Sequence, residues 1–207
     1  YGSFFYNLSE EQAKKCVLLL HTDPHDPYGQ DVNAILNDFG LNDGQVLISK
    51  EKVPPENLAA MYNIADVTVN ISDAEGFGLG TLESLSCGTP IVVNMTGGLQ
   101  EQVTDGKNWF GVGIEPCSKA LIGSQQVPYI YEDRISEEDF VAALLKMHGM
   151  TREERQEMGK KGREHVLKNY NFETFNKTWV DIMTRLNEHH GSWETRKNYK
   201  AWSVTEL

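Results

Sequence analysis

The chain has 207 residues, of which 40% are hydrophobic and 24% charged, a composition typical of a globular protein with one α/β domain. Its formal net charge of −11 argues against a nucleic-acid partner, because no basic surface is available for phosphates. Three scattered cysteines without a CxxC motif argue against a disulfide framework. No apolar run reaches the roughly 18 residues that span a bilayer.

Apolar runs of strand length alternate with amphipathic segments of helix length in the first part of the chain. They predict strands over 16–21, 45–49, 67–71, 90–94 and 109–114, and helices over 31–39, 54–62, 78–87 and 99–103. The continuous apolar run over 16–21 is typical of a strand buried on both faces of a parallel sheet. This rhythm predicts an α/β fold, a Rossmann-like doubly wound parallel sheet with helices on both faces.

Residues 115–134 break this rhythm with prolines and glycines, and they predict a loop insertion with a short strand near 129–131. The C-terminal third is helical, with helices over 136–147, 151–169 and 172–186. We therefore expect one domain over 1–190, followed by a tail over 191–207 that carries Trp193 and Trp202.

A loop with two glycines joins the strand over 67–71 to the helix over 78–87. The first N–H groups of a helix have no intrahelical partner and carry partial positive charge, so they attract anions. Gly76 and Gly78 lack a Cβ, which lets a phosphate approach the backbone around Phe77 to Leu79. The loop therefore predicts a site for a diphosphate.

Two carboxylates bracket this predicted site. Glu75 lies in the loop, and Glu83 lies five residues into the helix with its Cβ tilted back towards the helix N-terminus. A carboxylate repels a phosphate but accepts hydrogen bonds from hydroxyl groups. We therefore expect Glu83 to hold paired hydroxyls such as those of a ribose, and Glu75 to contact a sugar.

The segment from Glu75 to Glu83, with Gly-Phe-Gly-Leu between them and Cys87-Gly-Thr-Pro90 after them, resembles the sugar-donor site of retaining GT-B glycosyltransferases of the group 1 family. This family has glycogen synthase-like and mannosyltransferase members. Further segments resemble it in the same order: 18–23, 54–62, 65–66, 96–98 with Glu101, and 163–172.

The resemblance implies a C-terminal domain that binds a nucleoside-diphosphate sugar, whose hexose is transferred to an acceptor with retention of configuration. It implies that Glu75 is the catalytic residue. The implied binding residues for the sugar donor are Gly76, Phe77, Gly78, Leu79, Glu83, Lys52, Val53, His21 and Thr22. Lys52 and Val53 are candidates for the nucleobase, and His21 and Thr22 for the wall of the cleft. The family precedent implies no metal and a cytoplasmic enzyme, with any membrane attachment outside this chain.

Two departures from the family pattern stand out. The family enzymes have an N-terminal domain that binds most of the glycan or other acceptor, and 207 residues leave no room for it. The Arg and Lys that neutralise the diphosphate in the family are not found before Cys16. We therefore expect a fragment that lacks the first strand of the donor-binding domain and has little activity alone.

Other interpretations of the sequence are open. His21, Asp23 and His25 could form a metal-ligand set, but they lie on a strand end and a loop rather than on one helix face. The same fold could serve as a non-catalytic nucleotide-sugar-binding module or partner subunit, or as a sugar-nucleotide epimerase. A Rossmann dehydrogenase is disfavoured, because no Gly-x-Gly-x-x-Gly follows the first strand.

Overall fold

The computed structural model describes residues 1–27 and 29–198, and the chain divides into two compact units, Tyr1–Arg163 and Glu164–Leu207. Trp193 of the predicted tail is described, whereas Trp202 lies outside the described residues. The predicted domain over 1–190 and tail over 191–207 stay predictions, because compactness alone does not define a domain boundary.

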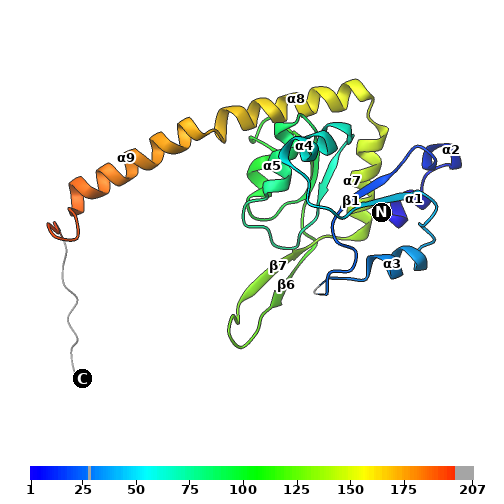
Figure 1. The fold of residues 1–207 in the computed structure, drawn as a ribbon, viewed down its shortest axis with the longest axis horizontal. Coiled ribbons are helices and arrows are strands. Elements are labelled where there is room, and N and C mark those ends of the chain that lie inside the picture. Colours follow the sequence, from blue (N-terminus) through cyan, green and yellow to red (C-terminus); the bar gives the residue numbers. More distant parts are fainter. Residues whose placement is uncertain (28, 199–207) are drawn as a thin grey trace. The chain divides into compact units, whose positions relative to one another are not determined.

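The first unit alternates strands and helices as the sequence predicts (Figure 1). Its elements are α1 (Gly2–Tyr6), α2 (Glu10–Ala13), β1 (Leu18–His21), α3 (Val32–Asp38), β2 (Val46–Ser49), α4 (Pro55–Ile64), β3 (Thr68–Asn70), α5 (Leu79–Ser86), β4 (Ile91–Asn94), α6 (Leu99–Val103), β5 (Gly111–Ile114), β6 (Ser118–Ile122), β7 (Ile130–Arg134), α7 (Glu137–Gly149) and the start of α8 (Arg152–Asn169). Every strand and helix predicted over residues 16–114 is present, with ends shifted by a few residues.

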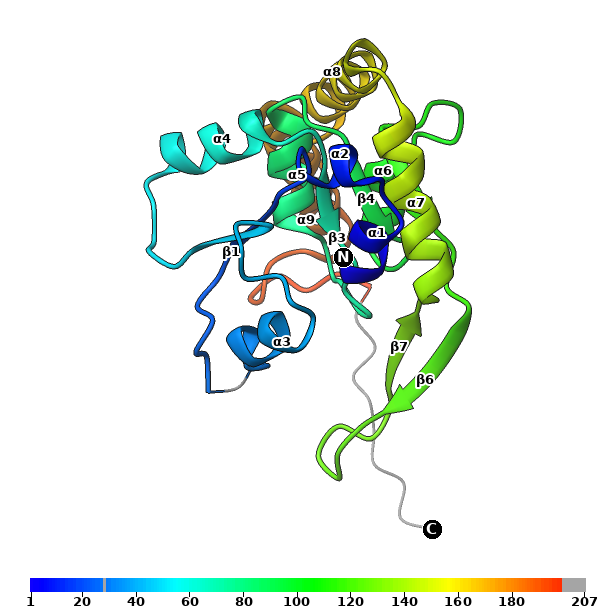
Figure 2. The same cartoon turned by 90° about the vertical axis from the view of Figure 1, so that its right-hand side faces the viewer.

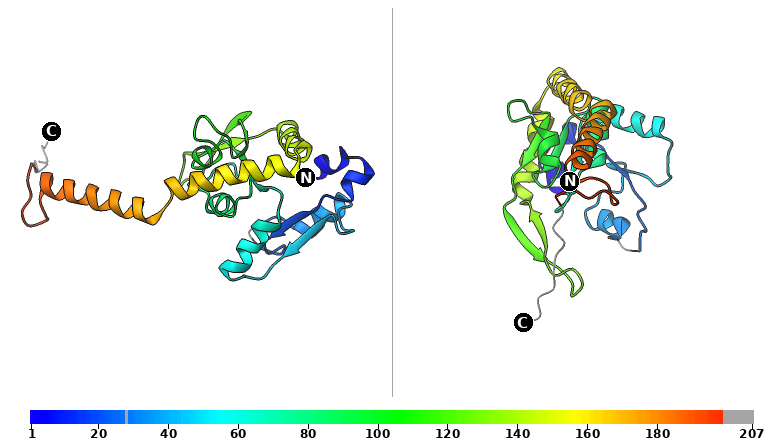
Figure 3. Two further views of the ribbon diagram at one scale, coloured as in Figure 1. Left: turned by 90° about the horizontal axis from the view of Figure 1, so that it is seen from above. Right: turned by 90° about the vertical axis from the view of Figure 1, so that its left-hand side faces the viewer.

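The parallel strands form two sheets among the described residues. β1 and β2 lie side by side, with Leu18 opposite Val46 (Figure 3), and β3, β4 and β5 form the second sheet in that order. The expectation that the strand over 16–21 is buried on both faces is wrong, since Leu19 of β1 is 37% exposed. Within the described chain β1 pairs only with β2, and a two-stranded sheet leaves much of its surface uncovered.

Helices cover both faces of the β3–β4–β5 sheet (Figure 2). Because side chains alternate along a strand, Val92 and Val112 face α7, where they pack with Met147. Ile91 and Val93 point to the opposite face, on the side of α5 and α6, and both are fully buried. This sheet is therefore the core of the unit, as expected for a parallel sheet, and it supports the loop between β3 and α5.

The insertion over 115–134 is an antiparallel hairpin of β6 and β7, with Lys119 opposite Asp133. The predicted strand near 129–131 is found as β7, whereas its partner β6 was not predicted. The hairpin extends away from the β3–β4–β5 sheet in two perpendicular views (Figures 1 and 2). Its base is therefore the part that contacts the rest of the unit.

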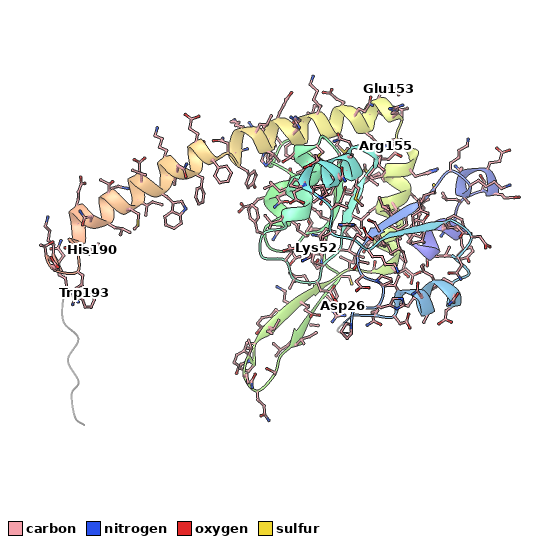
Figure 4. All side chains as sticks on the ribbon, in the orientation of Figure 1. Asp26, Lys52, Glu153, Arg155, His190 and Trp193 are labelled. Atoms are coloured by element: carbon pink, nitrogen blue, oxygen red, sulfur yellow. The ribbon has the colours of Figure 1, made fainter. Side chains whose placement is uncertain are left out.

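The helix starts follow the capping residues in the sequence. Ser136 accepts a hydrogen bond from the Asp139 N–H at the start of α7. Thr151 and Glu154 form both bonds of the predicted capping box at the start of α8. Arg155, labelled in Figure 4, lies in the first turns of the same helix, and it binds the carboxylate of Asp66 over 3.0 Å.

The second unit contains the end of α8 and the helix α9 (Phe172–His190). Asn171 caps α9 by accepting from the Thr174 N–H. The predicted apolar face is present, and most of its large side chains are exposed: Phe172, Phe175, Trp179, Met183 and Leu186. None of the described helices is both long and apolar enough to cross a membrane.

Candidate functional site

The predicted loop and helix are present between β3 and β4. Gly78 begins α5 with φ of +88°, and Gly88 follows its end with φ of +81°. A Cβ on Gly78 would lie 2.5 Å from the Leu99 side chain, so the packing at this point requires glycine. Gly76 is the open position instead, with no atom within 4 Å of the place that a Cβ would take.

The N-terminus of α5 is available to a ligand. No side chain caps it, and Leu79 in its first turn is 67% exposed. The partial positive charge of the helix end therefore lies at the surface, beside the backbone of Gly76 and Phe77. This arrangement can hold an anion through main-chain N–H groups.

Glu75 is held in the loop by a neutral side chain. The amide nitrogen of Asn70 donates to Glu75 Oε2 over 3.3 Å, while Asn70 Oδ1 accepts from the Ser72 N–H over 3.1 Å. Asn70 is the last residue of β3, so the end of the strand orients a half-buried carboxylate. A carboxylate fixed in this way can stabilise positive charge or accept hydroxyl hydrogen bonds.

Glu83 lies on the exposed side of α5 and accepts a hydrogen bond of 3.0 Å from the Tyr62 hydroxyl of α4. Burial, and then the hydrogen bond and charge of Glu83, raise the pKa of Tyr62 to about 12. The tyrosine is therefore a neutral donor at physiological pH and fixes the Glu83 carboxylate at the helix surface.

The turn at Gly97 and Gly98 packs against the backbone of the loop that carries Glu75. A Cβ on Gly97 would lie 1.6 Å from the carbonyl oxygen of Glu75, and one on Gly98 would lie 2.6 Å from that of Phe77. The fully buried Gln102 donates to the Phe77 carbonyl over 2.6 Å and accepts from the Thr81 hydroxyl over 2.6 Å. Buried, satisfied hydrogen bonds of this kind rigidify a segment.

The other predicted residues lie at the end of the β1–β2 sheet and in the segment after it. His21 Nδ1 lies 3.0 Å from Ser49 Oγ, and the Thr22 N–H donates to the Ser49 carbonyl over 2.9 Å. Lys52 is exposed and Val53 half-buried between β2 and α4 (Figure 4). Their predicted contacts with a nucleotide stay predictions.

The possible metal-ligand set at the end of β1 is not assembled. The His25 N–H donates to the Asp23 carboxylate over 3.0 Å, while the ring of His25 lies 3.4 Å from the Asn33 amide. Among the described residues, no three His, Cys, Asp or Glu side chains are grouped so that they could hold a metal ion.

Several residues that shape the site were not identified from the sequence. Asn70 and Asn94 are polar residues at the ends of apolar strands, and this position was the available signal. Asp133 lies in the insertion, where no sequence pattern connects it to the Glu75 loop. Gln102 lies in the short helix α6, and the sequence of this helix does not indicate that one of its amide side chains is buried.

A comparison with known protein families shows which family this chain belongs to. The family model described as "Glycosyl transferases group 1" matches residues 36–165, which include the loop, α5 and the glycine turn. The chain belongs to this family. The group 1 resemblance predicted from the sequence is thereby confirmed.

Relatives of this chain include proteins named D-inositol 3-phosphate glycosyltransferase. The protein of Acidothermus cellulolyticus is 40% identical over 90 residues, which are 43% of this chain and 20% of that protein. The protein of Streptosporangium roseum is 51% identical over 88 residues, 42% of this chain and 19% of that protein. The matched part of this chain thus spans about a fifth of the length of these relatives.

Solved structures share the fold. Sucrose-phosphate synthase from Thermosynechococcus elongatus superposes with a TM-score of 0.63 at 24% identity, covering 83% of this chain and 38% of that one. Anabaena HepE, solved with UDP and glucose, superposes with a TM-score of 0.60 at 16% identity, covering 85% and 43%. These likenesses confirm the predicted α/β fold.

Proposed function

We propose that this chain is the sugar-donor-binding part of a glycosyltransferase that moves a hexose from a nucleoside-diphosphate sugar to an acceptor with retention of configuration. The observation that carries the proposal is the uncapped N-terminus of α5, with Glu75 in the loop before it and Glu83 within the helix, in a chain that belongs to the group 1 family. The proposed catalytic residue is Glu75.

The geometry supports the roles proposed for the α5 N-terminus, Glu83 and Glu75. Main-chain N–H groups at the start of α5 would hold the distal phosphate, and Glu83 would accept hydrogen bonds from the ribose. Glu75, oriented by Asn70, would contact the transferred sugar and stabilise the positive charge that develops as the glycosidic bond breaks. Lys52 and Val53 are the proposed nucleobase contacts, and His21 and Thr22 the proposed cleft wall.

The same proposal covers what lies around the reaction. Helix N–H groups and basic side chains would neutralise the diphosphate, so no metal is required. The acceptor, a glycan or another hydroxyl compound, would be bound mainly by a further domain. The relatives are several times longer than the part that this chain matches, which leaves room for such a domain in them. We propose a cytoplasmic location, in line with the resemblance.

We also propose that one further parallel strand completes the sheet. The order β2–β1 followed by β3–β4–β5 corresponds to a doubly wound sheet, order 3-2-1-4-5-6, with its first strand left out between β1 and β3. Such a strand would pair with the free edges of β1 and β3.

The second candidate is a binding module that keeps the fold without catalysis. A module that binds a nucleotide sugar could also use the Glu75 carboxylate, as an acceptor for sugar hydroxyls, so the two candidates differ in whether the sugar is transferred. Loss of transfer on Glu75→Gln with unchanged nucleotide binding separates the two.

Calorimetric titration with UDP, GDP and ADP tests the proposal, and UDP comes first because the HepE structure holds UDP. Wild type is compared with Glu83→Ala and with Glu157→Ala, an exposed helical glutamate whose only described ion pair is with Lys161. We expect one nucleotide to bind wild type and Glu157→Ala, and Glu83→Ala to weaken it by on the order of tenfold or more. Equal binding to all three proteins would contradict the assigned site.

A further inference from the structure

The base of the β6–β7 hairpin contacts the loop that carries Glu75. The Asp133 N–H donates to the carbonyl oxygen of Asp73 over 2.7 Å, and Arg134 Nε lies 3.3 Å from the Asp73 carboxylate. Asp73 is only two residues before Glu75. The insertion is therefore joined to the loop by its main chain and by an ion pair.

Asp133 also binds the end of β4. Its carbonyl oxygen accepts from Asn94 Nδ2 over 2.6 Å, and its carboxylate accepts from the Thr96 hydroxyl over 2.8 Å. The carboxylate further pairs with Lys119 across the hairpin over 3.2 Å. One residue thus connects β6, the loop after β3 and the segment after β4.

Two of the partners of Asp133, Asn94 and Thr96, are shielded from water. Asn94 is fully buried and Thr96 is 5% exposed. Asn94 uses both N–H groups of its amide, one on Asp133 and one on the Ser72 carbonyl over 3.0 Å. The loss of a partner is costly at such a place, because the remaining polar group cannot turn to solvent.

The charge state of Asp133 suits this role. The hydrogen bond from Thr96, together with the charge of Lys119, holds the pKa of the Asp133 carboxyl below its usual value. The group is therefore ionised at neutral pH, and the hydrogen bond from Thr96 is charge-assisted.

We propose that Asp133 is a positioning residue for Glu75. At the start of the loop, the Asp133 N–H donates to the Asp73 carbonyl. Further along, the Glu75 carboxylate accepts from Asn70, and the Glu75 carbonyl packs against Gly97. This inference rests on the proposed function for its catalytic meaning, but the positioning itself is measurable without any substrate. A carboxylate moved by about 1 Å lowers a transfer rate by on the order of 100-fold without preventing substrate binding.

The test uses pairs of variants that differ in one group. Asp133→Ala removes the carboxylate, and Asp133→Asn keeps an oxygen that can accept from Thr96. Thr96→Val removes the hydroxyl at nearly constant volume, and Thr96→Ser keeps it. Asp43→Asn, at an exposed loop residue, is the matched control for a lost carboxylate charge.

Two readouts are taken. Hydrogen exchange of the loop over 73–77 reports its order directly, and the transfer rate with the nucleotide Kd reports the consequence in the full protein. We expect Asp133→Ala and Thr96→Val to speed loop exchange and to lower kcat on the order of 10- to 100-fold, with Kd unchanged. Asp133→Asn and Thr96→Ser should keep loop exchange and kcat close to the wild-type values. The double variant Asp133→Ala/Thr96→Val should be no worse than either single variant, because both remove the same hydrogen bond.

Unchanged loop exchange in a folded Asp133→Ala protein would overturn the proposal, whether or not the protein binds nucleotide. An equal loss of kcat and nucleotide affinity would also overturn it, because that pattern marks a general defect. If wild type binds no nucleotide but its loop loosens on Asp133→Ala, the proposed function fails while the positioning stands.

Discussion

The carbonyl oxygen of Glu75 occupies the space that a Cβ on Gly97 would need, at a distance of 1.6 Å. Two segments that follow neighbouring strands therefore pack backbone against backbone, with no room for a side chain on Gly97. Gly97 also has φ of +48°, a conformation that side chains disfavour. The glycine turn thus fixes the position of the loop backbone that carries the proposed catalytic carboxylate.

Substitution of this glycine has a predictable cost. We expect Gly97→Ala to lower the free energy of unfolding by about 3 kcal/mol or more, because it adds a backbone clash to the strain of positive φ. Gly106→Ala is the control, since Gly106 has φ of +85° with no atom within 4 Å of its Cβ position, and it should cost about 1 kcal/mol. Denaturant unfolding measures both, and equal losses would refute the close approach.

The Tyr62–Glu83 hydrogen bond predicts a pH dependence. The pKa of Tyr62 in the folded protein is raised to about 12, above the value of 10.0 for a free tyrosine. A raised pKa stabilises the fold below pH 10, and this stabilisation is lost as the pH rises from 10 towards 12. Tyr62→Phe should therefore be less stable than wild type up to pH 10, with a difference that shrinks above it.

Tyrosinate absorbance of wild type minus that of Tyr62→Phe gives the titration of this one group. Burial is the larger cause of the shift, so Glu83→Gln should lower the pKa of Tyr62 only in part. A difference titration centred at 10 in the folded wild-type protein would show that Tyr62 is neither buried nor hydrogen-bonded in solution as it is in the structure.

Asn70 offers a test of the catalytic carboxylate. Asn70→Asp places a second carboxylate beside Glu75, where the amide nitrogen now donates over 3.3 Å. Repulsion between the two groups should displace Glu75 and lower kcat on the order of 10- to 100-fold at neutral pH, with nucleotide Kd nearly unchanged. Asn63→Asp, on the exposed surface of α4, makes the same chemical change away from the loop and should leave kcat unaltered.

Local patterns were enough to predict much of this structure. The strands β1 to β5 and helices α3 to α6 follow apolar runs and caps, and the α5 boundaries follow from Gly78 and Gly88. The split into two sheets was not predicted, because strand pairing depends on which strands are present rather than on each strand alone. Asp133 was missed for a related reason: its partners Asp73, Asn94 and Thr96 are distant in sequence, and only the folded hairpin brings them together.

The measurement that tests the central claim most directly is chemical-shift mapping of the backbone amides during titration with the nucleotide that binds in calorimetry. The account predicts that the largest shifts fall on Gly76 to Gly80, at the loop and the start of α5, and that Glu83→Ala needs on the order of tenfold more nucleotide to produce them. Shifts concentrated elsewhere, such as on the shallow hollow between α1 and α7 lined by Ser3 and Leu145, would contradict it.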